Sequence, residues 1–170
     1  TWPSVKQLAR SSMWVWLAAI FGLSLEVLNP IILRQISGSE RVAEYSAGWT
    51  LVMLALLVVN QVGRVGKVAL SAHLQPEYSV SDQVKFLARY TFVMVGVGLV
   101  LSVAIFLLAE RIIQGLFPED YSGSAAPLRI LSWYPLIFAP YLVALQYLIA
   151  VQLQRTYFGL IVITSALSVG

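Results

Sequence analysis

Four long apolar segments limit what this chain can fold into. They cover residues 13–36, 46–66, 86–109 and 126–152. Each is long enough to span a bilayer, because about 20 helical residues cross a hydrocarbon core roughly 30 Å thick. A last apolar stretch begins at Tyr157 and reaches Gly170, which is too short to span. We therefore predict an all-α, polytopic transmembrane helix bundle with four complete spanning helices and a truncated fifth.

The composition agrees with a membrane protein and excludes several kinds of site. Of the 170 residues, 59% are hydrophobic and 11% are charged, whereas soluble domains usually carry roughly 25% charged residues. The chain has no cysteine, so disulfides, thiolate nucleophiles and cysteine-bound metals are excluded. His73, the single histidine, has no second metal ligand at suitable spacing, and no catalytic set of residues stands out. We predict one transmembrane domain over residues 1–170 that is not an enzyme and uses no cofactor or metal.

The charged residues predict an orientation. If the helices alternate in direction, seven basic and two acidic residues fall on one side, and four basic and five acidic residues on the other. The basic residues of the first side are Lys6, Arg10, Arg64, Lys67, Lys85, Arg89 and Arg155. By the positive-inside rule, the N-terminus and the 67–85 loop face the cytoplasm. We predict a multi-pass protein of the cell inner (cytoplasmic) membrane. Nucleic-acid binding is not expected, because the basic residues lie mostly at the ends of apolar segments.

A polar stripe on the first segment suggests a functional site. Ala18, Gly22, Glu26 and Pro30 recur every four residues, with Asn29 beside them. A charge near the bilayer centre costs about 2.5–3.5 kcal/mol on insertion scales, so this stripe should face protein or a cavity. Pro30 has no N–H and leaves the carbonyl of Glu26 without its helical donor. We predict Glu26, Asn29 and Pro30 as substrate-binding or coupling residues; the alternative is that Glu26 only hydrogen-bonds to another helix.

A second candidate lies at the end of the second segment. Asn60, Arg64 and Lys67 have the i, i+4, i+7 spacing that places them on one helix face near the cytoplasmic surface. Arginine offers a bidentate fork and lysine a point charge to a phosphate or pyrophosphate. The alternative is that these side chains only snorkel to the interface and set the orientation.

Prolines and glycines predict how the helices bend and meet. Pro135 and Pro140 lie in the fourth segment and should free the carbonyls of Leu131 and Leu136, which favours a kinked helix. Four glycines are expected to allow close helix approach: Gly63, Gly66, Gly96 and Gly98.

Several short motifs resemble a known family of transporters. They are "GSERVAEYSAGWTL", "LSAHLQPEYS", "IIQGLFPEDYSGSAAPLRILSW" and "LIAVQLQRTYFG". In this order they resemble the polysaccharide-transporter branch of the MOP flippase superfamily. The chain departs from that pattern in two places, since Tyr45 lacks the usual glycine shortly before it and Gln154-Arg155 stands where a "gk" pair is frequent.

The resemblance implies a membrane transporter that flips lipid-linked oligosaccharide or polysaccharide precursors by alternating access. Such a transporter has two six-helix bundles, and this chain resembles about five helices of the second. Its partners would be the lipid bilayer, the lipid-linked sugar and the remaining helices. Glu26 falls where that bundle often carries an acidic residue, whereas Arg64 and Lys67 match no fixed family motif. The alternatives are a drug/cation antiporter of the same superfamily and a non-transporting membrane subunit or assembly factor.

Overall fold

The structure is a computed structural model that describes residues 5–75, 78–151, 153 and 159. Between residues 5 and 37, it describes the side chains of Met13, Ile20 and Gln35 only. The elements are α1 (Val5–His73), α2 (Val80–Leu116), the 3-10 helix η1 (Glu119–Ser124), α3 (Ala125–Leu131) and α4 (Tyr134–Ala150). The described part of the chain contains no strand, so the all-α prediction is confirmed.

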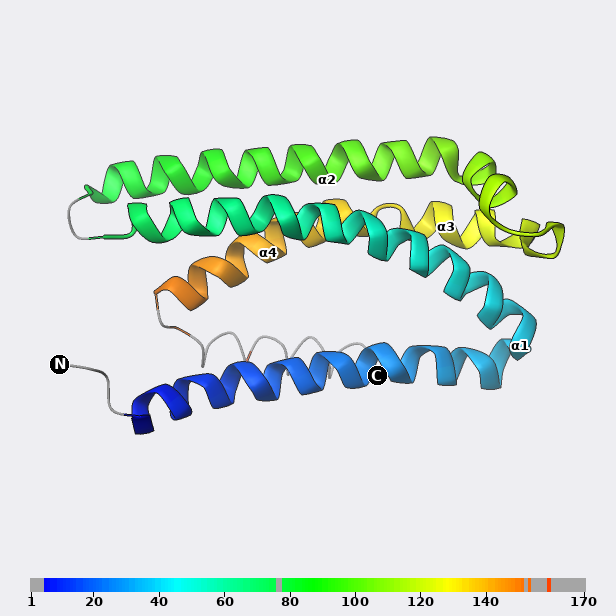
Figure 1. The fold of residues 1–170 in the computed structure, drawn as a ribbon, viewed down its shortest axis with the longest axis horizontal. Helices are drawn as coiled ribbons and strands as arrows, with labels where there is room; N and C mark the ends of the chain where they lie inside the picture. Colours follow the sequence, from blue (N-terminus) through cyan, green and yellow to red (C-terminus); the bar gives the residue numbers. More distant parts are fainter. Residues whose placement is uncertain (1–4, 76–77, 152, 154–158, 160–170) are drawn as a thin grey trace.

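Helix α1 reverses its direction at Gly38. This residue has φ 82° and ψ 170°, which is not helical and lies in a region that glycine alone occupies readily. Figure 1 shows the first limb of α1, residues 5–37, turned back below the second limb, residues 38–73, and diverging from it away from the bend. The first two predicted segments are thus separated by a reversal at one residue.

The connection between α1 and α2 is shorter than the predicted 67–85 loop. Helix α1 continues past Lys67 to His73, and α2 begins at Val80. Ser79 caps α2, because its hydroxyl accepts a hydrogen bond from the Asp82 N–H at 3.2 Å. The stretch 67–85 was expected to be an amphipathic interfacial piece broken by a turn at Pro76, a residue that lies outside the described ones. In the structure, helices α1 and α2 extend into this stretch from both sides, α1 up to His73 and α2 from Val80.

The His73 ring joins α1 to α2 at this connection. The ring stacks on Phe86 with 4.0 Å between centroids and on Tyr78 with 4.8 Å. Its Nδ1 lies 2.8 Å from the carbonyl oxygen of Ala69, one turn earlier in α1. His73 therefore has aromatic and backbone contacts that hold the two helix ends together.

The core lies where the second limb of α1, α2, α3 and α4 meet (Figure 1). One cluster joins α1, α2 and α4: Val59, Leu70, Tyr90, Met94, Ala139, Leu142 and Val143. The other joins α1, α2 and α3: Val52, Leu56, Ala109, Ile113 and Leu128. Many large apolar side chains outside these clusters are exposed, as expected for helices that face lipid.

Two described helices are long and apolar enough to cross a membrane, Gly38–His73 and Val80–Leu116. They contain the predicted segments 46–66 and 86–109, which confirms both. The fourth segment forms a pair of helices bent by 42°, and it is a third span only if the pair counts as one. The first segment has a helical backbone, but most of its side chains lie outside the described residues, as does the predicted fifth helix apart from Gly159. The described residues thus hold fewer spans than we predicted.

The bend in the fourth segment lies close to Pro135, one of the two prolines expected to kink it. Helix α3 ends at Leu131 and α4 begins at Tyr134. Pro135 occupies the first turn of α4, where a residue without an N–H is tolerated. Helix α4 continues through Pro140 without a break, so the bend is associated with Pro135.

Candidate functional site

The predicted phosphate-binding residues lie on the second limb of α1. The side chains of Arg64 and Lys67 are exposed, and within the described residues neither forms an ion pair. Asn60 is half-buried, and its Nδ2 donates to the Leu56 carbonyl oxygen of its own helix at 2.9 Å. The structure therefore presents Arg64 and Lys67 together, while the Asn60 amide is partly used by the backbone.

The backbone next to Arg64 is held by a buried polar junction of three helices. The Gln146 Nε2 of α4 donates to the Gly63 carbonyl oxygen of α1 at 3.3 Å. The Tyr90 hydroxyl of α2 donates to Gln146 Oε1 at 2.7 Å and lies 3.0 Å from the same Gly63 oxygen. A hydroxyl has one proton, so the shorter contact takes it. The junction fixes α1, α2 and α4 relative to one another.

Neither Tyr90 nor Gln146 was predicted from the sequence as a member of a polar site. A signal was present in "LVALQYLIA", where Gln146 is a lone amide within an apolar segment. An amide at membrane depth requires hydrogen-bond partners. That reasoning would have selected Gln146, although it could not have identified Tyr90 as the partner.

Three of the predicted glycines make close contacts between helices. A Cβ added at Gly63 would lie 2.7 Å from Leu142 Cδ2, and one added at Gly66 would overlap the Tyr90 ring. A Cβ at Gly98 would lie 2.7 Å from the Pro135 carbonyl oxygen. The predicted role of these three glycines is confirmed. The prediction was wrong for Gly96, whose added Cβ would meet nothing within 4 Å because this residue lies on another face of α2.

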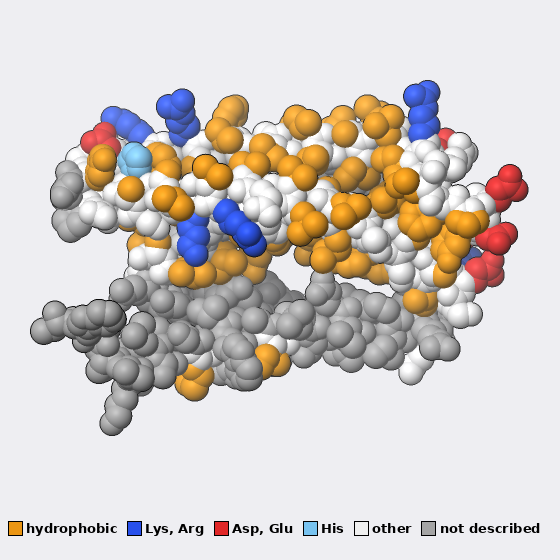
Figure 2. Space-filling view, viewed as in Figure 1, with side chains coloured by type: hydrophobic (Ala, Val, Ile, Leu, Met, Phe, Trp, Pro, Cys, Tyr) orange, Lys and Arg blue, Asp and Glu red, His pale blue; other side chains and the backbone are white. Residues whose placement is uncertain are grey.

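Exposed acidic side chains are more numerous at one end of the described bundle and basic ones toward the other, although Figure 2 shows both kinds at each end. Near the α1–α2 connection are four exposed basic residues: Arg64, Lys67, Lys85 and Arg89. The opposite end carries Glu110, Glu119 and Asp120, with Arg129 3.0 Å from Glu110. Of the basic residues near the connection, Lys85 has an acidic partner, Asp82 at 3.8 Å. These are the two groups of charges on which the orientation prediction rests, and the orientation itself stays a prediction.

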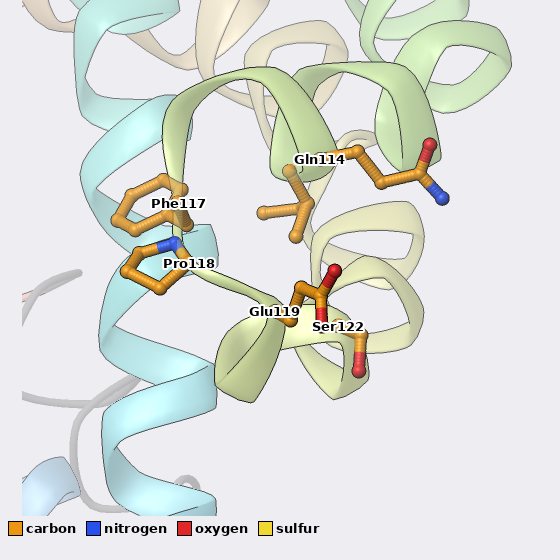
Figure 3. A pocket seen from close by; sticks show the side chains of 6 residues that line it. Gln114, Phe117, Pro118, Glu119 and Ser122 are labelled. Carbon is orange, nitrogen blue, oxygen red and sulfur yellow. The ribbon is translucent and has the colours of Figure 1, made fainter.

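A cavity of about 600 Å³ lies at the acidic end of the bundle, where α2 leads into η1. Its lining residues are Ile113, Gln114, Phe117, Pro118, Glu119 and Ser122. In Figure 3 the Phe117 and Pro118 side chains point toward α1, whereas Gln114 points away from it. The cavity has one carboxylate and no basic lining residue, so it does not suit a phosphate group.

The other predicted candidates, Glu26, Asn29 and Pro30, lie on the first limb of α1. Their backbone is helical, but their side chains lie outside the described residues. The polar stripe therefore stays a prediction, and the structure does not test whether it approaches Arg64 and Lys67.

Comparison with known proteins finds no family model, curated protein or solved structure that matches this chain. The resemblance to polysaccharide transporters rests on the short motifs quoted above. The fold and the two apolar helices define a membrane-embedded helical protein.

Proposed function

We propose that this chain is part of a membrane transporter that flips lipid-linked oligosaccharide or polysaccharide precursors across the cytoplasmic membrane by alternating access. The proposal rests on the pair formed by Arg64 and Lys67. Both side chains are exposed and lie one helical turn apart, and neither has an acidic partner among the described side chains. Such a pair suits a diphosphate, because arginine binds two of its oxygens and lysine adds a further charge.

The surroundings of the pair favour a phosphate that carries a lipid. Val65 and Val68 lie on the same helical turn, and their exposed fractions are 75% and 74%. On a helix, positions 64, 65, 67 and 68 share one broad surface. A ligand with a diphosphate and an apolar chain would contact both kinds of side chain, whereas a free sugar phosphate would leave the valines unused.

The buried junction supports a binding role for the pair. Because Gly63 is bonded through its carbonyl to the side chain of Gln146, the backbone that carries Arg64 is held by neighbouring helices. Recognition is more effective when the binding side chains stand on a rigid element. A drug/cation antiporter would instead require an acidic or aromatic face at this place, which the basic pair does not offer.

The path for a sugar must be walled by helices on all sides. The two or three spans among the described residues form one wall at most. We propose that the remaining walls of the path are formed by the predicted first span, the fifth helix and a second bundle. The N-terminus of this chain lies in the cytoplasm.

A binding experiment tests this proposal. The 170-residue chain, in nanodiscs of neutral phospholipid, is titrated with a fluorescent lipid-linked diphosphate oligosaccharide. The double variant R64Q/K67Q should bind about tenfold or more weakly, because each charge-assisted hydrogen bond contributes about 1.5–3 kcal/mol. Arg111→Gln is the matched control, since Arg111 is exposed at the opposite end of the bundle and has no ion-pair partner in the described region.

Two results would contradict the proposal. An equal loss of affinity in Arg111→Gln would show that the total charge matters and not the pair. Binding by R64Q/K67Q with wild-type affinity would leave Arg64 and Lys67 with an orientation role only, as in a non-transporting membrane subunit.

A further inference from the structure

One face of α2 carries two basic side chains followed by an apolar stripe. Lys85 and Arg89 are both exposed and lie one helical turn apart, so they share this face. Phe92 follows one turn later on the same face, and its exposed fraction of 80% is the highest among the large apolar side chains of the described residues. In Figure 1, α2 lies on the side of the bundle away from the first limb of α1. This face is therefore open to molecules around the protein.

The apolar stripe continues along the same face of α2. Gly96 and Val100 follow Phe92, each one turn after the last. Val100 is 68% exposed, and a Cβ added at Gly96 would meet nothing within 4 Å. From Arg89 to Val100 the helix rises by about 16 Å, which is close to half of a hydrocarbon core about 30 Å thick. The stripe therefore has the length of a lipid acyl chain whose headgroup lies at Arg89.

The two basic residues differ in how far they are neutralised. The Lys85 Nζ lies 3.8 Å from a carboxylate oxygen of Asp82, but both side chains are exposed, so this ion pair is weak. Arg89 has no acidic partner among the described side chains. A phosphate at this place gains a bidentate contact from arginine and a further charge from lysine. The choline group of a neutral phospholipid would instead bring a positive charge close to both.

We propose that this face of α2 binds one anionic phospholipid, with its phosphate at Lys85 and Arg89 and an acyl chain along Phe92, Gly96 and Val100. The basic residues favour an anionic headgroup, because each Lys or Arg near a membrane surface is attracted to anionic lipid. The exposed apolar stripe favours a lipid over a free phosphate. The basic pair of α1 takes no part in this site, so the proposal holds whether or not the chain moves a lipid-linked sugar.

Native mass spectrometry of lipid binding tests the proposal. The 170-residue chain in a neutral detergent is titrated with phosphatidylglycerol and with phosphatidylcholine of identical acyl chains. Wild type should bind phosphatidylglycerol about fivefold or more tightly than phosphatidylcholine, and Arg89→Gln should lose about fivefold in affinity for phosphatidylglycerol alone. Arg111→Gln is the matched control and should bind as wild type does. Arg111 is also an exposed arginine of α2 without an ion-pair partner in the described region, but it has no second basic residue one turn away on this helix.

A second variant separates the acyl chain from the headgroup. Phe92→Ala should weaken the binding of both lipids by a similar factor, because it removes apolar contact and no charge. Glycerol phosphate, which has no acyl chain, should not displace phosphatidylglycerol.

Four outcomes would overturn the proposal. Equal affinity of wild type for the two lipids would show that Lys85 and Arg89 only snorkel to the interface. An equal loss of affinity in Arg111→Gln would show that only the total charge matters. Unchanged binding of both lipids by Phe92→Ala, or displacement by glycerol phosphate, would show a phosphate contact without a lipid site. The wild-type comparison needs no variant, so it decides even if a variant fails to fold.

Discussion

Two glycines on α2 provide a matched test of the packing that defines the bundle. A Cβ added at Gly98 would lie 2.7 Å from the Pro135 carbonyl oxygen and 3.0 Å from Leu136 Cα, whereas one added at Gly96 would meet nothing within 4 Å. The atoms near Gly98 belong to the backbone of α4, so they cannot move aside as the tip of a side chain could. The Leu136 N–H also donates to the buried Ser102 hydroxyl at 3.2 Å, which ties α4 to α2 at this place.

The two alanine variants should change stability in opposite directions. Both replace a glycine within a helix, which gains roughly 0.5–1 kcal/mol of helix propensity. Gly98→Ala also forces α4 away from α2, and overpacking of this kind costs about 1–3 kcal/mol. The free energy of unfolding of Gly98→Ala should therefore be about 1–3 kcal/mol below that of Gly96→Ala.

Equilibrium unfolding in mixed micelles, followed by circular dichroism, measures this difference. Gly96→Ala serves as the control for propensity, because it carries the same substitution two residues away on the same helix. Equal unfolding free energies for the two variants would refute the close approach of α2 and α4 at Gly98.

Three further predictions concern the junction, the orientation and the polar stripe. Tyr90→Phe should lower the free energy of unfolding by about 1 kcal/mol, because Gln146 loses its hydroxyl donor; an unchanged value would show that the contact does not stabilise the bundle. An impermeant thiol reagent should label Ser122→Cys but not Ser81→Cys in spheroplasts, and the reverse pattern would invert the orientation. Glu26→Gln should lower transport by the full-length protein about tenfold or more at near wild-type abundance, whereas normal transport would leave Glu26 a packing role only.

The spanning segments could be predicted, because hydrophobicity determines their positions. The helix ends and the reversal could not, because they depend on local side-chain and backbone chemistry. Segments 46–66 and 86–109 were found because a spanning helix must be apolar over its whole membrane depth. Their ends were not found, because α1 and α2 extend through polar residues such as Ser71 and Asp82, and α2 begins at the Ser79 cap. The reversal at Gly38 was also missed, since sequence alone does not show which glycine adopts a positive φ.

Only part of the candidate site could be predicted, because helix geometry follows from the sequence and the alignment of packed helices does not. The spacing of Arg64 and Lys67 follows from helix geometry, so their common exposure could be expected. The bond between Tyr90 and Gln146 joins residues 56 positions apart and depends on how two helices are aligned. The same dependence separates Gly98 from Gly96, since only the packed structure shows which glycine faces α4.

Translocation in proteoliposomes tests the central claim most directly. The full-length protein is reconstituted with a fluorescent lipid-linked diphosphate oligosaccharide, and the fraction of sugar exposed on the outer leaflet is measured over time. We expect the wild-type protein to exchange the sugar between leaflets, the R64Q/K67Q variant to do so about tenfold or more slowly, and Arg111→Gln to match wild type. Exchange by R64Q/K67Q at the wild-type rate, or no exchange by the wild-type protein above the rate in empty liposomes, would contradict the proposed function.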